Sequence, residues 1–196
     1  MTYESDLILQ RQQKDRFFKS HPQSPLMPEQ RDLFLGLQYF PPNPALRLEL
    51  DIDTFADKQN VKLLTTTGES RYYLRWGKVH FEVEGEAAEL TLYYSPGHDS
   101  FFLPFMDATT GSDTYDAGRY LDPERITDSR VLLDFNLAYS PYCAFNEPLE
   151  LAEKAGREPR VWSCPIPPQE NRLKVAVKAG EKKPIGVWVI SDSEAH

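Results

Sequence analysis

The chain has 196 residues, 40% of them hydrophobic and 27% charged, which is the composition of an ordinary globular domain large enough to bury a sizeable core. Its formal net charge of -8 argues against a surface that binds nucleic acid or an anionic membrane, because both need a basic patch. No apolar run approaches the roughly 20 residues of a membrane span, and the acidic start is unlike a signal peptide, so we expect a cytoplasmic protein.

The N-terminal part of the sequence predicts two helices and a rigid connector. Ser5 can cap a helix that ends near Phe18, ahead of a proline-containing break. Pro28 suits the first turn of a second, shorter helix, and Gly36 suits its C-terminal stop. The proline-rich run 39–44 cannot hold regular structure over its length, so it predicts a stiff connector into the next region.

Alternating apolar and polar residues predict β-strands from Leu46 onward. Leucines and Ile52 alternate with charged residues, as in a strand with one wet face. Gly77 and Gly85 each stand at the first of two turn positions and predict type II′ hairpins. Pro104 places its strand at an edge or a bulge. Further strands are predicted over 61–67, 71–76, 79–83, 88–94, 101–106, 130–139, 173–177 and 185–190.

These elements predict a mainly β fold. The strands are short and regularly spaced, and no alternation of strands with helices marks a parallel sheet. We expect a bent antiparallel sheet closing as a barrel or sandwich, with one or two N-terminal helices packed on it. Residues 1–36 would form the helical segment and residues 37–196 the β domain of a single compact unit.

Several short motifs, each present once, are spread along most of the chain: Gly36-Leu37-Gln38-Tyr39-Phe40-Pro41, Gly118-Arg119-Tyr120-Leu121-Asp122, Asp134-Phe135-Asn136, and Cys164-Pro165 followed by Pro167-Pro168 and Glu170-Asn171. In these motifs the sequence resembles an uncharacterised bacterial and archaeal family known as a domain of unknown function, family 1684. The resemblance implies membership of that family and no particular activity.

Two segments, 107–122 and 134–171, combine polar residues, glycines, prolines and aromatics more densely than a plain strand or helix needs. We expect them to fold side by side and to form a pocket at one mouth of the β domain. The predicted ligand-binding residues are Asp113, Tyr115, Arg119, Tyr120, Asn136, Tyr139, Cys143, Cys164, Glu170 and Asn171.

The two cysteines, Cys143 and Cys164, allow several interpretations. A zinc site needs four ligands at close spacing, whereas the sequence offers these two thiols and four scattered histidines, so we expect no metal. Cys143 as a nucleophile needs a nearby base, and no histidine is well placed to be one. The remaining interpretation is a pair of buried, neighbouring free thiols that can be oxidised.

The charged candidates also have two interpretations each. Arg119 can bind an anion within its glycine-containing loop, or it can pair with a nearby aspartate and hold the loop in place. Asp107 and Asp134 follow apolar runs, so each can be a desolvated general acid or base, or can accept backbone hydrogen bonds in a turn.

For function we expect a small-molecule-binding domain without a cofactor. The first alternative is a hydrolase that uses Asp107 or Asp134 as its base and Arg119 as an electrostatic stabiliser, with Cys143 as a further candidate nucleophile. The second is a structural or interaction domain. The expected partner is a small ligand rather than nucleic acid or membrane, and the composition permits a homodimer.

Overall fold

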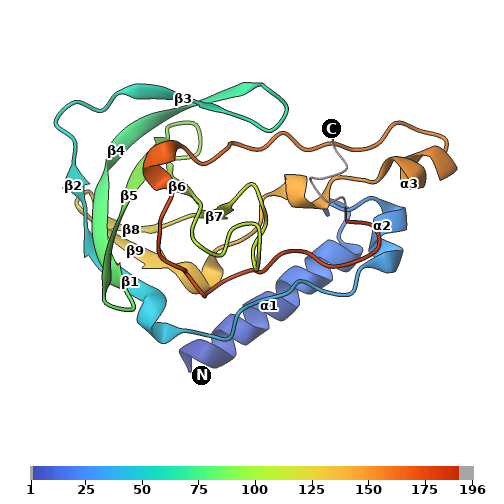
Figure 1. Ribbon diagram of the computed structural model, residues 1–196, viewed down its shortest axis with the longest axis horizontal. Helices are drawn as coiled ribbons and strands as arrows, with labels where there is room; N and C mark the ends of the chain where they lie inside the picture. The colour runs from blue at the N-terminus through green and yellow to red at the C-terminus, as the bar shows by residue number, and fades with distance from the viewer. Residues whose placement is uncertain (1, 190–196) are drawn as a thin grey trace.

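Two antiparallel sheets form the centre of the protein, whose computed structural model describes residues 2–189 (Figure 1). The smaller sheet has the order β1-β9-β8, with bounds Arg47–Asp51, Arg130–Asp134 and Glu124–Thr127. The larger, six-stranded sheet has the order β2-β4-β5-β6-β7, and β3 also pairs with β4. Its bounds are β2 Asp53–Thr54, β3 Asn60–Leu64, β4 Ser70–Val83, β5 Glu86–Ser95, β6 Ser100–Phe105 and β7 Arg119–Leu121. The two sheets form a sandwich-like arrangement and do not close into a barrel within the described residues.

The helices lie beside the sheets, on the side that Figure 1 shows at the right and below. Helix α1 spans Tyr3–Ser20, α2 spans Pro28–Leu33 and α3 spans Leu149–Lys154. The cap of α1 is Thr2 rather than the predicted Ser5: the Ser5 backbone donates to the Thr2 hydroxyl, and the Thr2 backbone donates to the Ser5 hydroxyl. This reciprocal capping box lets the helix begin earlier than predicted. No helix of residues 2–189 combines the length and apolarity needed to cross a membrane.

The hydrophobic interior has two parts. The first lies between the sheets and contains the apolar positions of β4, β5, β6 and β9, among them Val79, Leu90, Phe105 and Leu133. The second joins the helices to the irregular segments and includes Phe18, whose ring packs against Phe145 at 5.0 Å. Because both cysteines belong to this second part, the segments that carry them are attached to the sandwich by packing as well as by chain connection.

Gly77 does not form the predicted hairpin. Strand β4 continues through it, with a bulge between Arg75 and Gly77. A Cβ at Gly77 would lie 2.6 Å from the Asp53 carbonyl oxygen, so the glycine lets β2 pair closely with β4, where Thr54 is opposite Gly77, instead of turning the chain.

The predicted hairpin at Gly85 is present, but its turn type differs. The paired ends are Val83 and Glu86, so the two loop residues are Glu84 and Gly85. Both have positive φ, 52° and 85°, which is the pattern of a type I′ turn rather than type II′. Glutamate is therefore held in a conformation that Asn and Gly adopt more readily.

Glu84→Asn is expected to raise the free energy of unfolding by about 1 kcal/mol, because the left-handed conformation costs most L-residues roughly 1–2 kcal/mol and Asn tolerates it. Urea unfolding measures the change. Glu84→Gln is the matched control, since it removes the same charge without this preference. If the two variants are equally stable, relief of backbone strain is not the cause.

The predicted strands at 173–177 and 185–190 are wrong over the residues described, up to 189. The backbone at 173–177 makes separate bonds instead of a ladder: Leu173 N–H donates to Met106 O at 2.8 Å, and Val175 O accepts the Ala108 N–H at 3.0 Å. The N–H and carbonyl oxygen of Val177 bond to the side chains of Asp107 and Arg119. The strand predicted over 130–139 ends at Asp134, because this carboxylate accepts the Asn136 N–H at 3.1 Å and begins a 3-10 turn.

Candidate functional site

Backbone hydrogen bonds bring the two candidate segments together. Tyr120 and Tyr139 exchange both N–H···O bonds, at 2.8 and 2.9 Å. The end of β7 therefore lies beside the chain that leads into the cysteine region. This contact is what the sequence interpretation required of segments 107–122 and 134–171.

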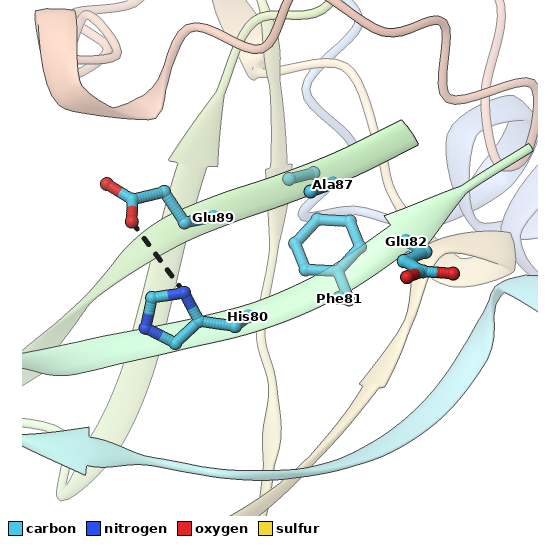
Figure 2. Close-up of a pocket in the computed structure, with 6 residues that line it drawn as sticks. His80, Phe81, Glu82, Ala87 and Glu89 are labelled. Carbon is cyan, nitrogen blue, oxygen red and sulfur yellow. Dashed lines mark ion pairs between the residues drawn. The ribbon is translucent and has the colours of Figure 1, made fainter. Parts of the chain in front are cut away.

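A hollow of about 510 Å³ lies elsewhere, on the β4–β5 hairpin. Figure 2 shows His80 and Glu89 facing each other across the two strands, and the His80 Nδ1 atom is 3.7 Å from a Glu89 carboxylate oxygen. Phe81 and Glu82, with Ala87 and Ala88, complete its lining. Two neighbouring strands make a shallow surface with few converging polar groups, so we do not regard it as the functional site.

The cleft at the junction of the two segments is a better candidate. Its volume is about 490 Å³, and α1, β4, β7 and the 139–165 region all contribute to it. From the predicted set it contains Tyr120, Tyr139 and Cys164. The full lining is Lys14, Arg71, Tyr120, Asp122, Tyr139, Pro141, Tyr142, Trp162, Ser163, Cys164 and Pro165.

Aromatic rings form much of the cleft wall. Tyr142 and Trp162 lie 5.1 Å apart between ring centroids, at an interplanar angle of 58°. Tyr120 and Tyr139 meet edge to face at 5.9 Å. Such surfaces bind the faces of flat apolar groups.

Polar groups stand at defined points among the rings. The Tyr139 hydroxyl donates to Asp122 Oδ2 at 2.9 Å. Lys14 Nζ lies 4.8 Å from the centre of the Tyr139 ring and also pairs with the buried Glu181 carboxylate. Arg71 Nη2 donates to the Ser163 carbonyl oxygen at 3.0 Å, and Arg71 forms no ion pair with the described residues.

The two cysteines are in direct contact, Cys164 lines the cleft, and both are free thiols. The Cys143 N–H donates to Cys164 Sγ at 3.3 Å. The hydrogen bond from the Cys143 thiol, together with the backbone N–H groups of Cys143 and Tyr142, lowers the pKa of Cys164. The same contact, with burial, raises the pKa of Cys143. A negative charge on this pair is therefore favoured at Cys164, the member that lines the cleft.

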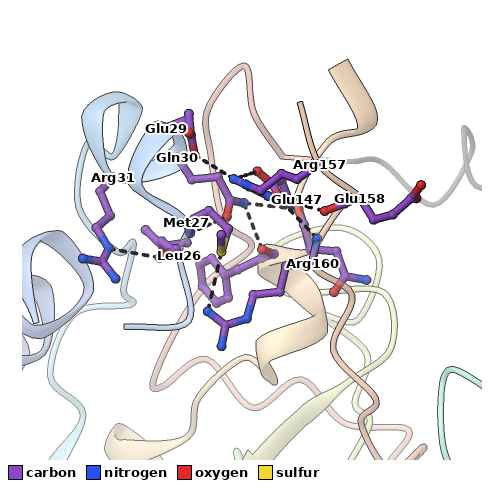
Figure 3. Close-up of polar contacts among 11 residues, drawn as sticks. Leu26, Met27, Glu29, Gln30, Arg31, Glu147, Arg157, Glu158 and Arg160 are labelled. Atoms are coloured by element: carbon purple, nitrogen blue, oxygen red, sulfur yellow. Dashed lines mark hydrogen bonds and ion pairs between the residues drawn. The ribbon is translucent and has the colours of Figure 1, made fainter. Parts of the chain in front are cut away.

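A polar network connects the end of the Tyr142–Phe145 turn, which carries Cys143, to helix α2 (Figure 3). Gln30 of α2 donates to the carbonyl oxygens of Phe145 and Asn146 at 3.0 and 3.3 Å. Arg157 bridges Glu147 and Glu29, with contacts of 2.7 and 2.8 Å from its Nη2 atom. The 3-10 turn Tyr142–Phe145 is thus fixed to the helices, which keeps Cys143 in place against Cys164.

Arg119 and Asp107 form a buried ion pair at 2.8 Å, with side-chain exposures of 1% and 0%. The arginine also donates to the carbonyl oxygens of Val177 and Ala179, and Asp107 accepts the Val177 N–H at 2.9 Å. Among the two interpretations of Arg119, holding the chain in place is the one that fits, although the partner is Asp107 and not a loop aspartate. Neither side chain lines the cleft.

Other predicted residues also have structural contacts. Asp134 accepts the Tyr3 hydroxyl, and Asn136 exchanges two hydrogen bonds with the Asn43 backbone, at 2.7 and 2.8 Å. Tyr115 is buried in the second core and hydrogen-bonds to the Cys143 thiol. Asp113 lies 3.6 Å from Lys182 on the surface.

The two residues of the Glu170-Asn171 motif brace the larger sheet. Glu170 forms an ion pair with Arg75 at 2.6 Å and accepts the Tyr93 hydroxyl. Asn171 is completely buried and bonds to backbone groups of β5 and β6. Neither side chain lines the cleft.

Sequence reasoning missed Lys14, Arg71 and Trp162. Lys14 lies in the polar middle of α1 and Arg71 on the wet face of β4, where nothing local distinguishes them from solvated residues. Trp162 had a usable signal, since it is a large aromatic residue two positions before Cys164 at the start of a proline-rich stretch. Within the described residues no cluster of three or more His, Cys, Asp or Glu side chains is placed to hold a metal ion.

Comparison with known proteins places these residues in a wider group. The family model described as "Protein of unknown function (DUF1684)" matches residues 32–182. The chain belongs to this family. The match covers β1 to β9 and both cysteines, so the DUF1684 unit includes the sandwich and most of the cleft.

A solved structure of a protein with a similar sequence supports the fold. The chain is similar to the uncharacterized protein from gene locus rrnAC0354 of Haloarcula marismortui, determined by solution NMR, with 38% identity and a TM-score of 0.63. The match covers 92% of this chain and 94% of that one. No curated protein matches the sequence. These findings establish family and fold and leave the activity to be inferred from the cleft.

Proposed function

We propose that this DUF1684 protein binds a small planar molecule in the cleft between Tyr142, Trp162 and Tyr139. The observation that carries the proposal is the convergence of these rings with a few placed polar groups, in a cleft of about 490 Å³. Small-molecule sites are typically concave, mostly apolar spaces of roughly 300–1,000 Å³ with a small number of orienting polar groups.

The charges around the cleft indicate the ligand's chemistry. Arg71 has no carboxylate partner among the described residues and keeps donors beyond the one given to Ser163. A carboxylate or phosphate on the ligand would accept a charge-assisted hydrogen bond from it. Asp122, already bonded to Tyr139, can accept a donor at another edge of the cleft. The ligand class that fits is a flat, mainly apolar molecule with one acidic group.

A thermal-shift screen of aromatic carboxylates and phosphates tests this proposal. A ligand at about 100 times its Kd is expected to add about 2.7 kcal/mol of stability, whereas saturated, neutral analogues are expected to give no shift. Absence of a shift across the whole aromatic acid set would count against the proposal.

Trp162→Ala is expected to weaken binding of any hit about tenfold, because an aromatic contact is worth about 0.5–1.5 kcal/mol beyond area burial. Titration calorimetry measures the Kd. Tyr72→Ala is the matched control, since Tyr72 is an aromatic residue on β4 that is 70% exposed and outside the cleft. Equal affinities of the two variants would place the ligand elsewhere.

No observation favours the alternative hydrolase with a carboxylate base. Asp107 and Arg119 bond to each other and to backbone in the core, and Asp134 is bonded to Tyr3 and Asn136. A general base must reach the proton that it removes, and none of these groups lines the cleft.

A further inference from the structure

Cys164 combines access with a neighbouring thiol. It lines the cleft, although its exposure is only 7%, and Cys143 lies directly behind it at 4% exposure. A small reagent entering the cleft therefore meets Cys164 before Cys143. The Cys143 N–H to Cys164 Sγ distance of 3.3 Å keeps the two residues in contact.

The groups around the Cys164 sulfur favour the thiolate. Hydrogen bonds reach it from the Cys143 thiol and from the backbone at the start of the Tyr142–Phe145 turn, and Arg71 of β4 adds a positive charge. The titratable groups around the pair are Tyr120 from β7, whose hydroxyl donates to Pro165, and Tyr115, which bonds to Cys143. Thr66 is a neutral neighbour, accepting the Cys164 N–H at 3.2 Å.

We propose that Cys164 and Cys143 form a redox-active pair, in which Cys164 reacts with small hydroperoxides that enter the cleft and Cys143 closes a disulfide with it. This inference goes beyond ligand binding and does not depend on it.

The chemistry follows the positions of the two sulfurs. The Cys164 thiolate attacks one oxygen of the hydroperoxide, so an S–O bond forms, the O–O bond breaks, and the alkoxide or hydroxide leaves and takes a proton from water. The Cys143 thiol then attacks the sulfenic sulfur, forming the S–S bond, while its proton and the sulfenic hydroxyl leave as water. The pair loses two electrons and the hydroperoxide gains them. An external thiol restores the reduced pair by exchange.

Hydrogen peroxide treatment of the full-length folded protein, followed by intact mass and peptide mapping, tests the reaction. The expected product is an intramolecular Cys143–Cys164 disulfide that dithiothreitol reverses. Cys143→Ser is expected to stop at a sulfenic acid on Cys164, which dimedone traps, while Cys164→Ser is expected to leave Cys143 unmodified. Wild-type protein that stays unmodified, while the urea-unfolded chain oxidises, would overturn the proposal, as would oxidation of Cys143 in Cys164→Ser.

Alkylation by iodoacetamide across pH tests the arrangement independently and needs no disulfide. Cys164 is expected to react with a midpoint below the ordinary thiol value of about 8.5. Cys143→Ser keeps a hydroxyl donor to Cys164 and is expected to keep this low midpoint, whereas Cys143→Ala removes the donor and is expected to raise it. The thermal unfolding of each variant is measured alongside. Identical midpoints in Ser and Ala variants that are both folded would refute the assigned role of Cys143.

Discussion

Asn171→Leu is expected to lower the free energy of unfolding by about 3–5 kcal/mol, because it leaves several buried backbone groups without partners and each costs about 1–3 kcal/mol. The Asn171 side chain accepts the Thr91 N–H at 2.8 Å and donates to the carbonyl oxygens of Thr91 and Pro104, both at 2.9 Å. A folded domain has only about 5–15 kcal/mol of stability in total, so the variant would be close to the limit of folding.

The position of Asn171 explains why so much depends on one amide. Strand β5 pairs with β6 only over Tyr93–Ser95, which lie opposite the first three residues of β6. Pro104, further along β6, has no N–H with which to continue the ladder. The amide of Asn171 stands between the diverging strands and bonds to both. The sequence placed Pro104 at an edge or bulge, and the structure shows what fills the resulting gap.

Urea unfolding of wild type, Asn171→Leu and Asn171→Asp measures the effect. Asn171→Asp keeps the acceptor for the Thr91 N–H but turns both donors into an acceptor, so it is expected to be destabilised as well. Asn60→Leu, at the exposed start of β3, is the control and is expected to change stability by less than about 0.5 kcal/mol. If Asn171→Leu lowers the free energy of unfolding no more than Asn60→Leu does, water must supply the hydrogen bonds that the Asn171 amide makes in the wild type.

Local patterns predicted the parts of the fold that local chemistry controls. Alternation in β4 places Val79, Phe81 and Val83 in the core and leaves His80 and Glu82 exposed. The hairpin at Gly85 follows from its turn residue in the same way, although its turn type differs.

The parts that failed depend on partners distant in sequence. Residues 173–177 have a strand-like pattern, yet the N–H and carbonyl oxygen of Val177 bond to the Asp107 and Arg119 side chains instead of to a neighbouring strand. Gly77 looks like a turn residue in the sequence, and the close pairing of β2 with β4 explains why a glycine stands there. Hydrophobic pattern and secondary-structure propensity do not predict contacts between residues distant in sequence, because both describe only a residue and its neighbours along the chain.

The same limit applies to the cleft. The predicted residues that line it are Tyr120, Tyr139 and Cys164, which stood out in irregular segments. Lys14 and Arg71 were not predicted, because they come from a helix and a strand with ordinary polar faces. Asn136, Glu170 and Asn171 stood out for the same reason, and each makes contacts inside the protein. A polar residue in an irregular segment therefore indicates a specific side-chain contact in this protein. The sequence does not show whether that contact is with another part of the chain or with the cleft.

Arg119→Met is expected to cost about 3–5 kcal/mol, because removing one partner of a buried pair leaves an uncompensated charge in the core. Asp107 would remain at 0% side-chain exposure with only the Val177 and Thr109 groups as donors. The carbonyl oxygens of Val177 and Ala179 would lose their bonds at the same time. The segment after residue 176 is thus expected to detach most easily, which hydrogen exchange at the Val177 amide would report.

A double-mutant cycle separates the ion pair from the backbone bonds. Arg119→Met leaves the Asp107 charge without its partner, and Asp107→Asn removes that charge. The double variant is therefore expected to lose less free energy of unfolding than the two single variants lose together. Arg119→Lys keeps the charge but loses the planar fork, and it is expected to fall between wild type and Arg119→Met. Arg130→Met is the surface control: its contact with Glu49 at 3.3 Å is exposed and worth about 0–1 kcal/mol. If Arg119→Met and Arg130→Met cost the same, burial of the first pair has no energetic consequence, and the packing of Val177 and Ala179 alone must hold that segment against the sandwich.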